Sequence, residues 1–200
     1  MRRLVARQSV RVRGSAVHPR SIPKPMDALR KNHFDLLGLK PAFSIDEALL
    51  ARAYRELQLA VHPDRFAAGT PLERRLAMQL SAQANEAHRC LRDPVSRAAY
   101  LCQLAGVAID EHTNTAMPVE FLQEQMSWRE SLEDSRVARD VSGLRALAAR
   151  IDAERSLRIA TLQCLLDEKN DARAASSEVR QLMFVDRFAE QIHEALDALA

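Results

Sequence analysis

The chain is poor in the residues that open turns and build sheets. Only 5 of its 200 residues are glycine and 4% are aromatic, whereas 47% are hydrophobic. Few glycines and ample apolar residues favour helices over turn-rich sheets, so the sequence predicts an all-α protein of one domain or two small ones. No apolar run approaches the roughly 18 residues that a membrane-spanning helix needs.

Sequence signatures of metal, cofactor and phosphate sites are also missing. The three cysteines, Cys90, Cys102 and Cys164, form no C-x-x-C pair and no cluster with histidine at zinc spacing. We therefore expect reduced, packed thiols in a cytosol-like compartment. A glycine-rich phosphate loop is absent as well. The sequence predicts neither a bound metal nor a cofactor.

Charge is distributed unevenly along the chain. Residues 1–25 hold seven of the 29 Lys and Arg residues and none of the 27 Asp and Glu residues. Proline-rich composition without an apolar stripe predicts a disordered basic tail over residues 1–27. Alternatives are a mitochondrial transit peptide, an artefact upstream of a true start at Met26, or an arm for nucleic acid or anionic lipid. No aromatic or motif context supports the last, so neither a nucleic-acid nor a membrane partner is expected.

Helical patterns follow the tail almost without interruption. Ser44, Thr70 and Asp93 are expected N-caps, the last two followed by proline at the first helical position. A polar stretch within residues 109–117 is the expected linker between two domains. The predicted helices are 28–37, 45–61, 71–91, 94–104, 118–138, 140–168 and 171–198. The last three predict an antiparallel three-helix bundle.

The tripeptide His62-Pro63-Asp64 directly follows the second amphipathic run. Proline lacks an amide donor and disfavours helical geometry in the residue before it, so a turn is expected there. An exposed imidazole, a rigid ring and a carboxylate make a polar knob suited to contact with another protein. In an enzymatic alternative His62 is a general base oriented by Asp64, but no nucleophile is placed by the sequence. The chain is therefore not expected to be an enzyme.

The tripeptide stands in order among four other motifs: Phe34–Leu39, Ala53–Leu57, Asn85–Leu91 and Arg97–Tyr100. Together they resemble the J-domain, the module that couples client proteins to DnaK-type chaperones. The resemblance implies a helical hairpin with short flanking helices over residues 28–108. It also implies chaperone contacts by a set of residues at the turn and on the preceding helix: His62, Pro63, Asp64, Arg65, Arg52 and Arg55. Glu56 and Ala60 replace basic residues of the common pattern, which implies weaker or more selective docking.

Further motifs extend the resemblance to the end of the chain: His62–Phe66, Phe121–Glu130 and Val179–Arg187. They are similar to the HscB/Hsc20 subfamily, which assists iron–sulfur cluster assembly. The resemblance implies that residues 118–200 bind an IscU-type scaffold and that the protein delivers it to an HscA-type chaperone, stimulating its ATPase. The implied scaffold-binding residues are Leu122, Gln123, Met126, Ser127, Glu130, Asp134 and Phe184. Gln123 and Ser127 depart from the subfamily pattern.

Helical periodicity gives an independent view of these residues. Phe121, Trp128 and Leu132 share a stripe assigned to the bundle core, and the implied binding residues of the same helix gather on another face. The alternative is that Leu122 and Met126 widen the core stripe. Phe184 lies about 200° around its helix from the buried Leu182, so it is expected to face outward. The alternative places Phe184 against the J-domain.

The function expected from these observations is a J-domain co-chaperone of iron–sulfur cluster maturation. One alternative is a co-chaperone for a different client. An alternative of another class is a basic-tailed protein that binds nucleic acid or membranes. The expected compartment is the bacterial cytoplasm, with the mitochondrial matrix as the alternative.

Overall fold

The computed structural model describes residues 30–109 and 117–199, which form helices and no strands. The basic tail and linker residues 110–116 lie outside the described residues. The elements are α2 (His33–Leu37), α3 (Glu47–Val61), η1 (Pro63–Phe66), α4 (Pro71–Arg92), α5 (Pro94–Leu104), α6 (Val119–Val137), α7 (Val141–Gln163), η2 (Cys164–Glu168) and α8 (Ala172–Asp197). The prediction of an all-α fold is confirmed.

Local capping explains where α4 and α5 begin. The Thr70 hydroxyl accepts the Glu73 N–H at 3.2 Å, and the Glu73 carboxylate accepts the Thr70 N–H at 2.8 Å. This reciprocal pair satisfies two amide groups that a helix start leaves unpaired. The Asp93 carboxylate accepts the Ser96 N–H at 2.7 Å in the same way. The N-caps predicted at Thr70 and Asp93 are confirmed.

The N-cap of α3 is Asp46, so the prediction of Ser44 as the cap is wrong. The Asp46 carboxylate accepts the N–H groups of Ala48 and Leu49 at 2.9 and 3.1 Å. The N–H of Ser44 instead donates to Asp167 in η2, at 2.8 Å. Serine and aspartate cap helices about equally well. The local sequence therefore could not separate the two residues.

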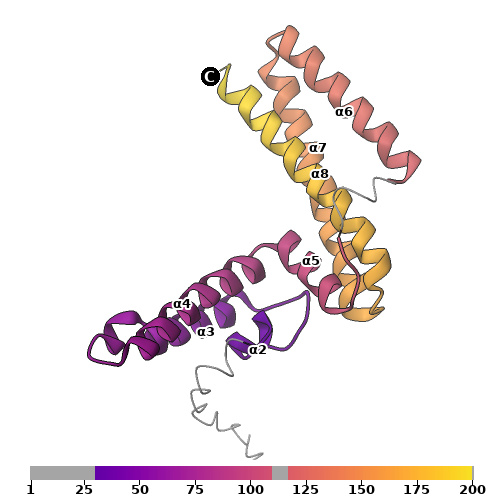
Figure 1. Cartoon of the computed structure of the whole chain (residues 1–200). Coiled ribbons are helices and arrows are strands. Elements are labelled where there is room, and N and C mark those ends of the chain that lie inside the picture. The colour runs from indigo at the N-terminus through magenta and orange to yellow at the C-terminus, as the bar shows by residue number, and fades with distance from the viewer. Residues whose placement is uncertain (1–29, 110–116, 200) are drawn as a thin grey trace, which may run out of the picture.

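The C-terminal helices form the predicted three-helix bundle. Helices α7 and α8 run antiparallel along each other, and α6 packs beside them (Figure 1). The left-handed residue Arg139 reverses the chain between α6 and α7, and Asn170 does so between η2 and α8. The bundle core is apolar and includes Phe121, Trp128, Leu132, Leu144, Ile151, Leu162, Val179, Leu182, Val185, Phe188 and Ile192.

The molecule has the shape of an L with α5 at its corner (Figure 1). One arm is the α3–α4 hairpin and the other is the α6–α8 bundle. Buried residues of α5, Val95, Ala98 and Cys102, belong to the same apolar core as Ala175 and Val179 of α8. The hydrophobic core therefore continues across the point where the sequence places a linker.

A polar contact reinforces this corner. The Asp167 carboxylate accepts the N–H groups of Phe43 and Ser44 at 2.7 and 2.8 Å. The buried guanidinium of Arg97 lies 5.1 Å from the centre of the Phe43 ring and donates to the carbonyl of Leu91 at 2.6 Å. Burial lowers the pKa of Arg97 from its ordinary value. The loop before α3 is thus held by groups of α5 and η2.

Candidate binding surfaces

We define the turn surface as the residues of the α3–α4 turn and the neighbouring basic residues of α3: His62, Pro63, Asp64, Arg65, Arg52 and Arg55. Pro63 begins η1, and His62 before it has extended backbone angles, as expected for a residue that precedes proline. The His62 and Asp64 side chains are 55% and 90% exposed. His62 Nδ1 accepts the Asp64 N–H at 3.3 Å, which orients the imidazole within the turn. The imidazole and the carboxylate expected to be exposed are therefore exposed.

The basic residues of the turn surface are not all free cations. Arg52 lies 3.8 Å from the Glu56 carboxylate, one helical turn along α3. Arg65 donates to the carbonyl of Leu59 at 3.0 Å, so its guanidinium covers the end of α3. Arg55 is exposed. Glu56 therefore offsets part of the positive charge, in agreement with the departure noted in the sequence.

Leu59 is a residue of this surface that the sequence analysis missed. Its side chain is among the most exposed large apolar groups of the described residues. It lies one turn after Arg55 and off the stripe that buries Leu50 and Val61. Its offset from that stripe was the available signal, but the sequence analysis assigned it no role.

We define the α6 surface as six exposed residues of α6 together with Phe184 of α8: Leu122, Gln123, Met126, Ser127, Glu130, Asp134 and Phe184. The six α6 residues are all exposed, with Leu122 at 43% and Met126 at 63%. Phe121, Trp128 and Leu132 of the same helix are buried. The two faces predicted for this helix are confirmed, and Leu122 and Met126 do not widen the core.

Phe184 differs from the expectation of an outward-facing ring. It is half-buried, meets Phe121 edge-on with ring centres 5.8 Å apart, and stacks on Phe188 at 6.2 Å. The Arg129 guanidinium lies 5.5 Å from the Phe184 ring centre. Side chains of α6 thus cover the ring, which a projection of α8 alone cannot foresee. Arg129, which the sequence analysis missed, extends the edge of the α6 surface.

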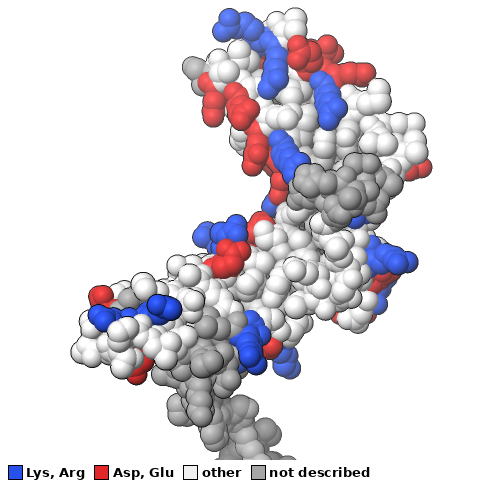
Figure 2. All heavy atoms as spheres, viewed as in Figure 1, with Lys and Arg blue, Asp and Glu red and all other residues white. Residues whose placement is uncertain are grey.

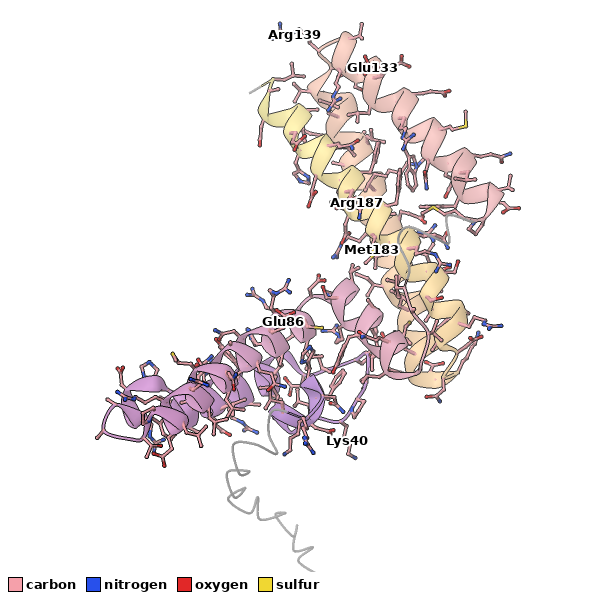
Figure 3. The ribbon with its side chains drawn as sticks, in the orientation of Figure 1. Lys40, Glu86, Glu133, Arg139, Met183 and Arg187 are labelled. Atoms are coloured by element: carbon pink, nitrogen blue, oxygen red, sulfur yellow. The ribbon has the colours of Figure 1, made fainter. Side chains whose placement is uncertain are left out.

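The alternative position for Phe184, against the N-terminal arm, also differs from the structure. Met183 and Arg187, which flank Phe184 on α8, lie in the middle of the bundle and apart from Glu86 on the α3–α4 hairpin (Figure 3). The contacts of the Phe184 ring come from α6 and α8. Phe184 therefore belongs to the same part of the molecule as Leu122 and Met126.

Two depressions on the described residues lie apart from both the turn surface and the α6 surface. These two depressions measure about 470 and 460 Å³, and neither is lined by His62 or Asp64. No group of three or more His, Cys, Asp or Glu residues in the described ranges is placed to hold a metal ion. No described helix is long and apolar enough to cross a membrane. Charged side chains of both signs are interspersed over the bundle (Figure 2).

Comparisons with known proteins identify both arms. A family model described as the DnaJ domain matches residues 32–100, and one described as the HSCB C-terminal oligomerisation domain matches residues 117–193. The "Co-chaperone protein HscB homolog" of Burkholderia multivorans is 48% identical over 174 residues, which cover 87% of this chain and 99% of that protein. The homolog of Burkholderia cenocepacia is 47% identical with the same coverage.

Solved structures agree with the sequence relatives. Chaperone HscB from Vibrio cholerae superposes with a TM-score of 0.74 at 33% identity and covers 85% of this chain and 100% of its own. Human co-chaperone protein HscB superposes with a TM-score of 0.77 at 26% identity and covers 82% of each chain. Sequence, domain order and fold together show that this chain belongs to the HscB family of J-domain co-chaperones.

Proposed function

We propose that this co-chaperone binds an IscU-type iron–sulfur scaffold on its α6 surface and an HscA-type chaperone on its turn surface. The best support for this proposal is that the two exposed surfaces lie on different arms of the L, and that a shared apolar core joins α5 at the corner to the bundle. A scaffold held by one arm is presented to a chaperone held by the other. We further propose that residues 28–108 and 118–200 are the two functional units, separated by a linker at 109–117.

The turn surface supports docking to an acidic site on the chaperone. His62, Asp64 and Arg55 are exposed on or beside a short turn, so they can reach a partner without rearrangement of the helices. The partial neutralisation of Arg52 by Glu56 leaves Arg55 and Arg65 as the main cations. Charge complementarity of this kind orients docking and raises the encounter rate more than it adds affinity. Leu59 would add apolar contact next to these cations.

The α6 surface has the mixed character of a protein interface. Leu122, Met126 and the half-buried Phe184 provide an apolar centre, and Glu130 and Asp134 continue the same exposed face of α6. Apolar centres with a polar rim are typical of protein–protein interfaces. We infer that the scaffold presents apolar groups to Leu122 and Met126 and basic groups to Glu130 and Asp134.

The decisive experiment measures the ATPase rate of the HscA-type chaperone with the co-chaperone, with the scaffold and with both. We expect the two proteins together to stimulate the rate more than either alone. His62→Gln should abolish the stimulation of the ATPase rate that the co-chaperone provides. Scaffold binding and helicity should stay unchanged, because His62 is exposed and fills no cavity. Undiminished stimulation by His62→Gln at matched concentration would rule out the turn surface as the chaperone contact.

A co-chaperone for a different client is the alternative within the same family. Calorimetric titration with the apo-scaffold separates the two, since binding is expected only for the iron–sulfur function. The bacterial relatives support a cytoplasmic location in bacteria, which fractionation of the expressed protein tests directly.

A further inference from the structure

A largely buried arginine of α7 joins all three helices of the bundle. The Arg158 side chain is 11% exposed. Its guanidinium pairs with Glu154 of its own helix at 2.6 Å and with Glu178 of α8 at 3.0 Å, and it donates to Gln181 Oε1 at 2.8 Å. A buried cation is costly unless its partners and geometry compensate for the lost hydration. These three acceptors fix the plane and position of the guanidinium.

The face of the same guanidinium lies on an aromatic ring from the third helix. The carbon at the centre of the Arg158 guanidinium is 4.4 Å from the middle of the Phe121 ring on α6. Two other arginine–ring contacts in the protein measure 5.1 and 5.5 Å. A cation–ring contact is stronger where water is excluded. Arg158 therefore connects α6 to a group that α7 and α8 hold in place.

The ring that Arg158 holds is also the ring that supports Phe184. Phe121 meets Phe184 edge-on at 5.8 Å between ring centres, with the two ring planes 85° apart. Leu122 follows Phe121 directly in the chain, and Met126 lies one turn further along α6. A shift of Phe121 thus moves Leu122 and Met126 relative to Phe184. The distance from Leu122 and Met126 to Phe184 therefore depends on the position of Phe121.

Arg155, one turn before Arg158, makes a comparable link without the ring. Its Nε lies 2.8 Å from the Asp186 carboxylate of α8, and both side chains are about one-third exposed. Arg155 thus ties α7 to α8, as Arg158 does, but the structure gives it no aromatic contact with α6. A comparison of variants at the two arginines therefore distinguishes an effect on the stability of the bundle from an effect on the position of α6.

We infer that Arg158 is a positioning residue that sets the α6 surface by holding Phe121 against Phe184. The inference rests on the proposed scaffold function of that surface. Arg158 itself is covered and touches no partner. It acts on binding through the Phe121 ring, which fixes the distance between the α6 and α8 portions of the site.

The test is a double-mutant cycle between Arg158→Lys and Phe184→Leu, with apo-scaffold affinity and thermal melting as readouts. Lysine keeps the charge but lacks the planar group that pairs with two carboxylates while it stacks on a ring. Arg158→Lys should weaken scaffold binding about five- to tenfold, a loss that lies between the exposed and the fully desolvated worth of a cation–ring contact. In the Phe184→Leu background the same change should weaken binding less than twofold. The matched control Arg155→Lys should lower the melting temperature without changing affinity.

Two outcomes would overturn the inference. One is an Arg158→Lys variant that melts earlier but binds the scaffold as tightly as the original protein. The other is a full, additive loss of affinity in the double variant. If Arg158→Lys does not fold, Glu178→Gln replaces it, since that change frees one side of the guanidinium and should give the same non-additive loss. An unchanged affinity in Phe184→Leu alone would instead count against Phe184 in the proposed scaffold site.

Discussion

Two leucines of α6 differ in exposure, and a change at each is expected to affect a different property, binding or folding stability. Leu122 is exposed on the α6 surface, whereas Leu132, less than three turns away, is buried among the bundle helices. Periodicity alone predicted this difference, because both positions are defined by one helix and its single buried stripe. Phe184 was harder to predict, since its environment is made by Phe121 and Arg129 from another helix.

The double change Leu122→Ala, Met126→Ala should weaken scaffold binding by about 2 kcal/mol, or roughly 30-fold, the size of an interface hot spot. The melting temperature should stay nearly unchanged, because both side chains are already exposed. The control Leu132→Ala should lose about 2–5 kcal/mol of folding stability, as expected for a buried leucine. Calorimetric titration and thermal melts measure the two effects. A large fall in melting temperature for the double variant would indicate that Leu122 and Met126 belong to the hydrophobic core.

The three cysteines should differ in reactivity. Burial raises the pKa of Cys90 and Cys102 to about 11, so their thiolate forms are scarce at neutral pH. Cys164 is half-buried and donates to the Glu168 carboxylate at 3.6 Å. We expect a thiol reagent to modify Cys164 in the folded protein and the other two only in denaturant. Rapid modification of three thiols under native conditions would contradict this.

At the scale of an element, α2 and α4 each carry a histidine whose pKa is lowered, His33 and His88. Burial lowers the pKa of His33, against a smaller raising effect of Glu86. Burial, together with the neighbouring Arg92, lowers the pKa of His88. His33 stacks on Tyr100 with ring centres 4.3 Å apart, and His88 stacks on Tyr54 at 4.2 Å. Both rings are therefore part of the packing of the N-terminal arm.

These shifts predict a stability that falls in mild acid. A histidine with a lowered pKa in the folded state contributes its full stability above the unfolded value of about 6.5. As the pH falls below that value, the unfolded chain takes up protons more readily than the folded one. The melting temperature should therefore drop between about pH 7.5 and pH 5. The double variant His33→Gln, His88→Gln should show a flatter pH profile, and an equally steep one would argue against this cause.

Sequence patterns predicted the helices well and their tertiary contacts poorly. The caps at Thr70 and Asp93 could be found because each is satisfied within a few residues of itself. The cap of α3 was mispredicted because Ser44 and Asp46 are equally good caps, and the contact of the Ser44 N–H with Asp167, far along the chain, had no local signal. The candidate surfaces follow the same rule. The exposed positions of α6 were predictable from one helix, whereas Arg129 and Arg158 gain their roles from rings on other elements.

At the scale of the whole molecule, Asp167 links the two arms of the L. Its carboxylate holds two consecutive N–H groups of the loop before α3. Asp167→Asn keeps the size of the side chain but leaves only one oxygen to accept them. We expect a loss of about 1.5–3 kcal/mol of stability, the worth of a hydrogen bond to a charged group. Small-angle X-ray scattering should also show a broader range of arm separations.

The exposed Asp152 of α7 offers a matched control for this change. Asp152→Asn removes the same charge from a solvent-facing position and should leave both melting and scattering unchanged. If the two variants behave alike, the contact of Asp167 with Phe43 and Ser44 does not hold the corner.

The shared core at α5 has a consequence for how the two partners meet. A stiff corner confines a scaffold bound on one arm to a small volume near a chaperone bound on the other. The second encounter then resembles an intramolecular one, governed by effective concentration rather than by the bulk concentration of either partner. Chaperone stimulation by the bound scaffold would accordingly depend little on dilution. Loosening the corner would lower that effective concentration while leaving each separate affinity intact.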